Sequence, residues 1–389
     1  EDSPVVATPF AWIDPKTLPL REFAYGTHYI RKYVSVTVSP GGLGKTSNSI
    51  AEALAMTCGR GLLGVKPPSR MRVWLFNAED PRDEMERRIM AACLHYKLRP
   101  DDINGLFVDT GREQELVVAI EDKRTGVKYQ VPIIEAVVNQ IKANAIDVMI
   151  VDPFVSTHGV NENDNGAIDK VAKLWAHIAD ETNCAIDIVH HLRKVADREA
   201  TVEDARGAVA LIGAARSVRV LNRMSIEEAK EANIGADDRT SYFNIHQGKA
   251  NLTRMSSAQD WRRLVSVPLG NGRGITKPQD FAGVVTEWKW PSAEDMTSEV
   301  TPEQFGRIAS LLGIGTYKLK PQGKPWAGEA VAVGLGLDPD DKAARGRCTT
   351  LLRAWIDEGR LSVVEEVDTK TRHAVKFVRA KIDESAFSA

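Results

Sequence analysis

The stretch Ser39-Pro40-Gly41-Gly42-Leu43-Gly44-Lys45-Thr46 follows an apolar run at residues 33–38 and decides the fold. An apolar strand that passes through a glycine-rich turn into a helix is typical of a phosphate-binding loop. Glycines there let successive backbone N–H groups converge on a phosphate chain. The usual pattern begins with glycine, where this chain has Ser39. The predicted nucleotide-binding loop consists of Pro40, Gly41, Gly42, Leu43, Gly44, Lys45, Thr46 and Ser47.

Two side chains at the end of this loop predict how the nucleotide is held. Lys45 is expected to reach the β- and γ-phosphates of ATP, and the Thr46 hydroxyl is expected to ligate Mg²⁺. ATP hydrolysis also needs a carboxylate that holds the magnesium shell. Residues 148–151 are apolar and run into Asp152, which we predict to be this second magnesium residue. The alternative is that Asp152 only closes a buried strand.

A candidate general base follows another apolar run, residues 73–76, in Asn77-Ala78-Glu79-Asp80-Pro81. The carboxyl ends of parallel strands face the ligand, so Glu79 is expected beside the γ-phosphate. A carboxylate there accepts a hydrogen bond from water and polarises it for attack. Alternatively, Glu79 or Asp80 caps the helix that begins near Pro81. Because Asp80 suits the capping role, Glu79 is the carboxylate we predict to be catalytic.

A histidine pair, His190 and His191, ends the apolar run at residues 185–189. Adjacent side chains on a strand point to opposite faces, so the two rings do not easily share one metal ion. One of them is expected to sense the γ-phosphate, and the other to lie in the core. The basic run at residues 193–223 suits a solvated face, but Arg206 and Arg216 have apolar flanks that suit arginines reaching across a subunit interface.

Composition limits the possible partners. The 389 residues carry 27% charged side chains and a formal net charge of only −2, so no global basic field attracts nucleic acid or membrane. The four cysteines lie in apolar stretches without the C-x-x-C spacing of zinc or redox sites, which predicts buried thiols in a reducing compartment. With no signal peptide and no apolar run near 18 residues, a soluble, cytoplasmic protein without membrane contact is expected.

Residues 33–290 alternate between short apolar runs and amphipathic stretches, which predicts an α/β domain with a mainly parallel sheet and crossover helices. Strands are expected at 34–38, 72–77, 106–109, 147–152, 185–190 and 217–221. Helices are expected at 46–57, 82–96, 133–144 and 167–182. A hairpin is expected within 116–131, and antiparallel edge strands near 242–247 and 261–268. Residues 225–239 are expected to form a solvated loop or a short helix.

The two ends of the chain differ from this pattern. Residues 1–32 read as an extended arm interrupted by prolines, which packs on the core or on a neighbouring subunit. Residues 291–389 predict a linker and a small module with helices beginning at Pro302 and around Cys348, followed by two strands at 361–364 and 375–378. Helices followed by a two-stranded wing suggest a winged-helix module.

Taken in order, these motifs resemble the RepA-type hexameric helicases of plasmids and phages, which have a RecA-like core related to DnaB. The resemblance covers roughly residues 10–270. It implies that Glu79 is the catalytic base, His191 the phosphate-sensing residue and Arg216 the arginine finger acting on a neighbour. It also implies that Lys249 touches the neighbour's nucleotide, and that DNA contacts come from loops 153–165 and 192–204.

The chain departs from this family in two places. Loop 153–165 is polar and has no arginine or lysine, and the C-terminal module exceeds the minimal core. The sequence as a whole predicts an ATP- and Mg²⁺-dependent ring motor, a homo-hexamer, that acts as a replicative helicase on single-stranded DNA. A replication initiator or a primase is a possible partner. The alternatives are a RecA-like ATPase without unwinding activity, such as a recombination mediator or a switch, and a scaffold that ATP only assembles.

Overall fold

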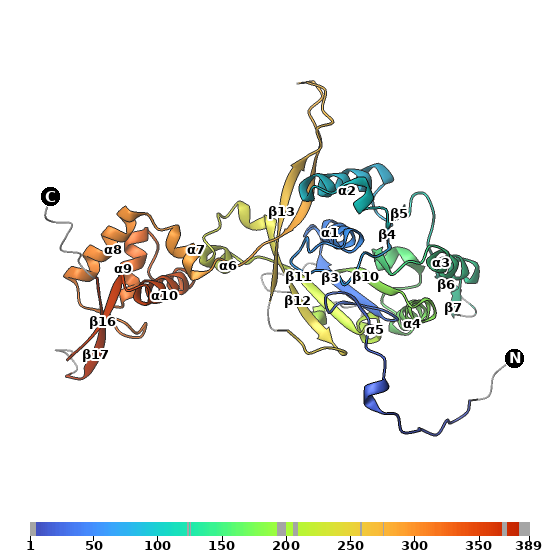
Figure 1. Ribbon diagram of the computed structural model, residues 1–389, viewed down its shortest axis with the longest axis horizontal. Helices are drawn as coiled ribbons and strands as arrows, with labels where there is room; N and C mark the ends of the chain where they lie inside the picture. Colours follow the sequence, from blue (N-terminus) through green and yellow to red (C-terminus); the bar gives the residue numbers. More distant parts are fainter. Residues whose placement is uncertain are drawn as a thin grey trace. The chain divides into compact units, whose positions relative to one another are not determined.

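The chain folds into two units in the computed structural model, which describes residues 5–122, 124, 126–192, 200–204, 209–256, 259–274, 276–367 and 372–380 (Figure 1). The first unit contains the chain up to Asn222 together with Ile245–Gln259 and Val265–Thr286. The second contains Arg223–Asn244, Asp260–Leu264 and the chain from Glu287 onward. Part of the segment that the sequence analysis assigned to the ATPase domain thus packs with the C-terminal module. No described helix is long and apolar enough to cross a membrane.

A nine-stranded sheet forms the centre of the fold, in the order β14-β13-β12-β11-β3-β10-β8-β4-β5. The six strands from β11 to β5 are parallel, as predicted. Backbone hydrogen bonds from Met224 to Tyr242 and from Asn251 to Arg216 make β12 antiparallel to β11. The bounds are β3 Val34–Pro40, β4 Val73–Asn77, β5 Leu106–Thr110, β8 Val148–Asp152, β10 Ala185–Leu192, β11 Ser217–Arg223, β12 Tyr242–Ala250, β13 Asp260–Pro268 and β14 Phe281–Glu287.

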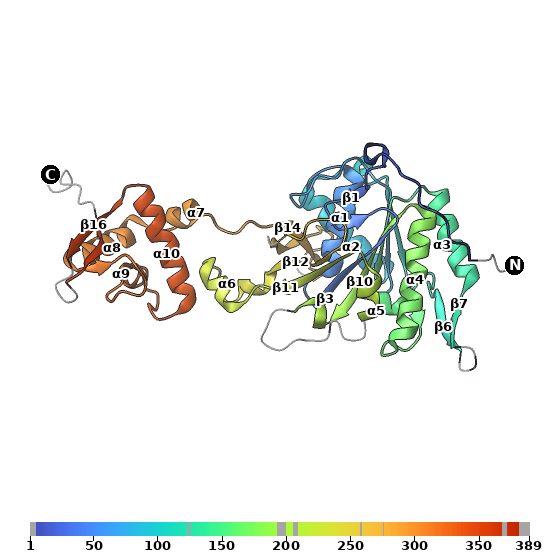
Figure 2. The ribbon, with the colours of Figure 1, turned by 90° about the horizontal axis from the view of Figure 1, so that it is seen from below.

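Helices cover both faces of this sheet, which explains why its central strands read as continuous apolar runs. Helices α1 (Lys45–Cys58) and α2 (Arg82–Tyr96) pack on the face that carries Val73 and Leu75. Helices α3 (Val131–Ala143), α4 (Asn165–Thr182) and the short α5 (Val209–Ala214) pack on the other face, which carries Trp74 and Phe76 (Figure 2). Helices α1 to α4 were predicted to within two residues at each end.

Smaller elements surround the sheet. Strands β6 (Ala119–Asp122) and β7 (Gly126–Tyr129) form the predicted hairpin, and the short β9 (His158–Gly159) pairs with β6. The edge strand β14, and the pair β1 (Phe23–Tyr25) and β2 (Tyr29–Ile30) within the N-terminal arm, were not predicted. These segments are too short, or too weakly alternating, to stand out as strands before their partners are known.

The second unit contains the predicted wing together with α7, β15 and α9, which were not expected. From α8 onward its order is helix, strand, two helices and two strands, with a sheet β15-β17-β16, an order that winged-helix modules also have. Buried Trp326, Cys348 and Trp355 form the centre of its core. The bounds are α6 Ile226–Glu231, α7 Ala293–Ser298, α8 Pro302–Ile314, β15 Tyr317–Lys318, α9 Ala327–Leu335, α10 Lys342–Asp357, β16 Leu361–Val367 and β17 Ala374–Ala380.

Two arginines of helix α10 form contacts within the second unit. Arg345 lies over the Trp326 ring at 4.6 Å and donates to the Pro321 carbonyl at 3.1 Å. Arg347 is buried, and it donates to the Asn233 side chain and lies 3.3 Å from Glu299. Helix α6 packs against α10 within the same unit. The segment before β12 therefore belongs structurally to the C-terminal module.

Candidate nucleotide-binding site

The phosphate loop has the backbone shape that its glycines predict. Gly42 and Gly44 have φ values of 75° and 83°, a region that side chains other than glycine rarely adopt. A Cβ atom at Gly41 or Gly42 would meet nothing within 4 Å, so the loop faces open space. Gly44 is the N-cap of α1 and carries no capping side chain. The loop therefore forms an open cradle at the positive end of a helix dipole, which suits an anion.

Ser39, where the loop pattern departs from glycine, is compatible with this cradle. The residue is completely buried at the end of β3, and its hydroxyl donates to the Pro40 carbonyl at 2.8 Å. Its backbone lies opposite His191 of β10. Serine fits here because its hydroxyl is hydrogen-bonded to the next residue of the chain.

Lys45 points into the cradle. Its ammonium lies 2.8 Å from His191 Nδ1, and 3.5 Å and 3.4 Å from the carbonyl oxygens of Ser39 and Pro40. Burial lowers the pKa of Lys45, and the negative charges of Asp152 and Glu79 partly offset that effect. When a phosphate binds, the Lys45 ammonium would therefore lose only two long contacts to carbonyl oxygens and one contact to the His191 ring.

Asp152 and Thr46 are hydrogen-bonded to each other next to Lys45. The Thr46 hydroxyl donates to Asp152 Oδ2 at 2.7 Å, and Asp152 is 1% exposed. Burial raises the pKa of Asp152 against the opposing effects of the Thr46 hydrogen bond and the Lys45 charge. The second oxygen, Oδ1, is buried without a hydrogen-bond partner among the described residues. A hydroxyl beside an unsatisfied carboxylate oxygen fits the hard oxygen donors that Mg²⁺ takes.

Glu79 lies after β4 with its side chain half exposed, and its Oε1 is 3.2 Å from His191 Nε2. Asn77, a residue that the sequence analysis did not single out, shapes this turn by accepting the backbone N–H groups of Glu79 and Asp80 at 3.0 and 2.8 Å. The expectation that Asp80 caps the next helix is wrong. Pro81 is the N-cap of α2 without a side-chain hydrogen bond, and Asp80 pairs with Arg88 at 2.8 Å.

The two adjacent histidines point to opposite faces of β10. His190 is buried with its ring 6.2 Å from the Phe154 ring, and burial, followed by the neighbouring His191, lowers its pKa to about 4. His191 instead lies between Lys45 and Glu79. The strand geometry thus brings His191 to the loop and leaves His190 in the core.

Arg216 and Lys249 lie close enough for the Arg216 charge to lower the pKa of Lys249, after the larger effect of burial, but neither is beside the phosphate loop of its own chain. Arg216 precedes β11 and donates its backbone N–H to the carbonyl of Val34, at the start of β3. The loop follows the other end of β3, a separation of roughly 20 Å. Lys249 of β12 donates to the Ile212 and Gly213 carbonyls at 2.8 and 3.0 Å.

Part of the predicted site lies outside the described residues. This applies to Arg206 and to residues 193–199 of the second loop expected to contact DNA. The other expected DNA loop, 153–165, is described, and its Asp164 accepts the backbone N–H groups of Gly166 and Ala167 as the N-cap of α4. The Asp164 carboxylate of this loop therefore caps the helix that follows it.

A buried ionic network beneath the loop was missed. Arg219 of β11 is 7% exposed and pairs with Glu52 of α1 at 2.6 Å, so the solvated-face interpretation of the basic run is wrong at this position. Asp187 accepts from the Thr37 hydroxyl at 2.8 Å and lies 2.9 Å from His28 Nε2. The sequence contained one signal of this network: Asp187 and Arg219 are isolated charged residues within otherwise apolar strands.

Fold and site together define an α/β core with a phosphate-binding loop, in which the loop strand β3 lies between β10 and β11. The chain belongs to the AAA domain family, whose profile matches residues 1–197.

Two of the solved structures that are similar to this chain illustrate the likeness. One is a DnaB-like replicative helicase, from a structure of that helicase and its interactions with primase, with 12% identity and a TM-score of 0.43 over 61% of this chain and 56% of that chain. The other is the RadB recombinase, with 12% identity and a TM-score of 0.39 over 61% of this chain and 89% of that chain. The match thus spans little more than half the length of the helicase chain.

Proposed function

We propose that this protein is an ATP-hydrolysing motor that assembles as a hexameric ring and acts as a helicase on single-stranded DNA. One observation carries the proposal: Lys45, Glu79 and Asp152 gather at the ends of three parallel strands around the open phosphate loop. A phosphate cradle alone only binds, whereas a carboxylate beside it supplies the proton acceptor that hydrolysis needs.

Each residue of this group has a separate role in the proposal. Lys45 and the loop N–H groups neutralise the phosphates, and Thr46 and Asp152 hold Mg²⁺, which supplies positive charge to the phosphate oxygens when bound. Glu79 orients water and accepts its proton, a role that its half-exposed carboxylate allows. His191 contacts both Lys45 and Glu79, so a change at the phosphates reaches Glu79 through one ring.

A second subunit completes the site in this proposal. Arg216 and Lys249 lie too far from their own phosphate loop to reach it, by the length of β3. An arginine supplied by a neighbour stabilises the charge that develops on the transferred phosphoryl group. Arg206, which lies outside the described residues, is kept as a further candidate. Ring assembly follows because each subunit both offers and receives such an arginine.

The remaining parts are assigned to DNA and to partners. Loops 153–165 and 192–204 are proposed to face single-stranded DNA. The C-terminal module is proposed to dock a replication initiator or a primase, because Arg345 and Arg347 of α10 are engaged within their own unit and are not available to read duplex DNA.

The test combines hydrolysis, unwinding and mass. Phosphate release, displacement of a labelled strand from a forked duplex, and the mass of the assembly with ATP and single-stranded DNA are measured on the full chain. The proposal expects both activities and a mass of six subunits. Hydrolysis without strand displacement indicates a recombination mediator or a switch. Assembly without hydrolysis indicates a scaffold.

A further inference from the structure

The turn that carries Glu79 depends on the side chain at the end of the strand before it. Asn77 is the last residue of β4 and is completely buried. Its Oδ1 accepts the backbone N–H groups of Glu79 and Asp80 at 3.0 and 2.8 Å. An asparagine that accepts the N–H group two residues further on takes the place of a backbone hydrogen bond and fixes the turn. The direction in which Glu79 leaves the strand is thus set by Asn77.

The same turn is joined to the two strands beside β4. The Ala78 N–H donates to the carbonyl of Asp152, at the end of β8, at 2.8 Å. On the other side, the Gly111 N–H follows β5 and donates to the Asn77 carbonyl at 2.9 Å. In the sheet register Asn77 lies opposite Asp152 and opposite Thr110. A displacement of the turn would therefore disturb hydrogen bonds to both β5 and β8.

Gly111 approaches this turn more closely than a residue with a side chain could. A Cβ atom at Gly111 would lie 2.8 Å from Ala78 Cα and 3.0 Å from Ala78 Cβ. Carbon atoms in contact lie about 3.5–4.0 Å apart, so an alanine would push the loop and the turn apart by roughly 0.7–1.2 Å. The backbone of Gly111 is not left-handed. The contact with Ala78, and not the backbone conformation, is what disfavours a side chain here.

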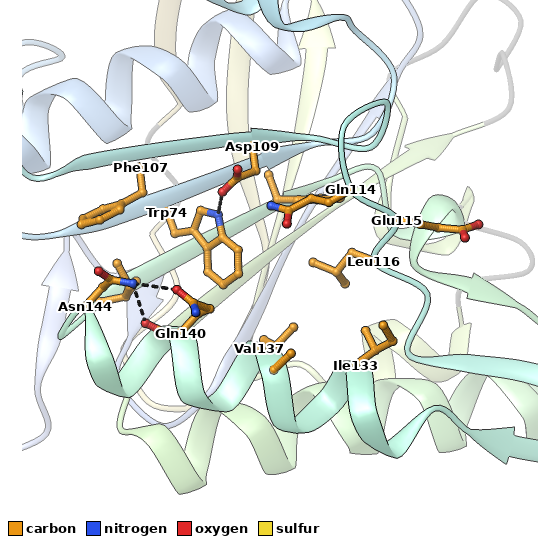
Figure 3. A pocket seen from close by; sticks show the side chains of 13 residues that line it. Trp74, Phe107, Asp109, Gln114, Glu115, Leu116, Ile133, Val137, Gln140 and Asn144 are labelled. Carbon is orange, nitrogen blue, oxygen red and sulfur yellow. Dashed lines mark hydrogen bonds between the residues drawn. The ribbon is translucent and has the colours of Figure 1, made fainter.

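Strands β4 and β5 are also joined on the opposite face of the sheet. Trp74 of β4 donates from Nε1 to Asp109 Oδ2 of β5 at 2.8 Å, in the pocket that Figure 3 shows. Asn77 is three positions from Trp74 on the same strand, so its side chain points to the other face. Because contacts on both faces hold the two strands together, a clash at Gly111 would displace the turn and not the strands.

We propose that Asn77 and Gly111 are positioning residues for hydrolysis, which hold the Glu79 carboxylate where it can accept a proton from water beside the phosphate loop. The inference rests on the role that the proposed function gives to Glu79. A general base must lie within hydrogen-bond reach of the water that it activates, and a misplacement of about 1 Å can slow a reaction about 10²-fold. Asn77 and Gly111 thus act on hydrolysis through Glu79, and not on the binding of phosphate to Lys45.

Alanine substitution at two glycines tests the close approach. Gly111→Ala should lower kcat about 10- to 100-fold and leave KM and the affinity for a fluorescent ATP analogue unchanged. Gly105→Ala is the matched control, because a Cβ there would lie 2.6 Å from the Met71 carbonyl oxygen, roughly 20 Å away at the other end of β5. It introduces a similar clash far from Glu79. Equal kcat values for the two variants, or a parallel loss of nucleotide affinity in Gly111→Ala, would overturn the proposal.

Two variants of Asn77 test the hydrogen bonds without a steric clash. Asn77→Ala removes the accepting oxygen and should lower kcat. Asn77→Ser keeps an oxygen that can accept the N–H group two residues further on, although more weakly, and should recover part of the rate. Both variants shorten the buried side chain, and thermal unfolding measures what each loses in stability. A kcat that follows stability and not the presence of the oxygen would contradict the positioning role.

A double variant separates this inference from the proposed function. If Gly111 acts only through Glu79, Gly111→Ala should cause no further loss in a Glu79→Gln background, as measured by single-turnover hydrolysis. An equal loss in both backgrounds would show that Gly111 acts elsewhere. Normal hydrolysis by Glu79→Gln contradicts the proposed role of Glu79, and this inference with it. A slow Glu79→Gln together with normal Asn77→Ala and Gly111→Ala contradicts the inference alone.

Discussion

Lys45 Nζ lies 2.8 Å from His191 Nδ1. A charged ammonium has only donors, so this ring nitrogen must accept and carries no proton while Lys45 is charged. In the neutral ring the proton is then on Nε2, which lies 3.2 Å from Glu79 Oε1 and makes no hydrogen bond among the described residues. The side chain expected to bind the phosphates and the one expected to activate water are thus connected through one imidazole, and nucleotide binding at Lys45 should alter both contacts of His191.

Replacing Lys45 by alanine should abolish ATP turnover and weaken nucleotide binding. The lost charge-assisted contact is worth about 1.5 to 3 kcal/mol, roughly 10- to 150-fold in affinity. Titration with a fluorescent ATP analogue and a phosphate-release assay measure the two effects. Lys173→Ala is the matched lysine control, because Lys173 is exposed on α4 and pairs with Asp169. Normal turnover in Lys45→Ala would refute the phosphate-loop interpretation.

Glu79→Gln should bind nucleotide normally but hydrolyse it about 10² times more slowly or worse. The amide keeps the shape of the side chain and removes the proton acceptor. Single-turnover hydrolysis separates this chemical effect from binding. Asp80→Asn is the control, because Asp80 pairs with Arg88 instead of facing His191. The opposite pattern, with a slow Asp80→Asn and a normal Glu79→Gln, would identify Asp80 as the base.

Arg216→Ala should bind nucleotide but lose multimer-dependent hydrolysis by a factor of order 10³, the range of an arginine finger. Mixing it with Lys45→Ala protein should restore part of the activity. The first variant keeps an intact phosphate loop, and the second keeps the arginine. Hydrolysis is followed across mixing ratios. If no ratio recovers activity, Arg216 does not act on a neighbour.

The buried network should make the protein sensitive to acid. Burial by itself raises the pKa of Asp187, but the charges of His28 and Arg219 and the hydrogen bonds to this carboxylate hold it at about 2, below the ordinary 3.8. A depressed pKa stabilises the folded state above the unfolded value, and that stability is lost as the pH falls through the folded value. The contribution is about 2 kcal/mol above pH 5 and disappears towards pH 2.

Urea unfolding between pH 7 and pH 3 measures this contribution. Asp187→Asn should destabilise the protein at pH 7 and flatten the fall in stability at low pH. The exposed Asp180→Asn is the control and should retain the parent pH dependence. An unchanged slope in Asp187→Asn would show that the network does not set the acid sensitivity.

Deleting residues 300–389 should spare ATP hydrolysis but uncover the segment before β12. In the full chain Lys230 pairs with Asp341 at 2.6 Å, and Asn233 accepts from Arg347. Without α10 these partners are lost, so residues 223–244 should become accessible to protease. Limited proteolysis of the full and shortened chains, with phosphate release as the activity control, checks this. Equal protection in both chains would contradict it.

Local features of the sequence were sufficient for most of the fold. The glycines of the loop were recognisable because their positive φ values are a property of individual residues, as Gly42 and Gly44 show. The strands with two buried faces were recognisable as short continuous apolar runs. Helices α1 to α4 were recognisable because burial repeats with a regular period along each of them. The candidate residues Lys45, Thr46 and Asp152 could be named because each directly follows such a local pattern.

Contacts between distant parts of the chain decided what the sequence left open. The position of His191 between Lys45 and Glu79 depends on three different strand ends, and the burial of Arg219 depends on Glu52, 167 residues away. Likewise, Asp80 pairs with Arg88 and does not cap the helix. Sequence periodicity says which face a residue occupies, but the partner on that face comes from another segment. Only tertiary packing brings a buried charge and its partner together. The free energy of burying a charge depends on that partner, because a buried charge without one strongly destabilises the fold.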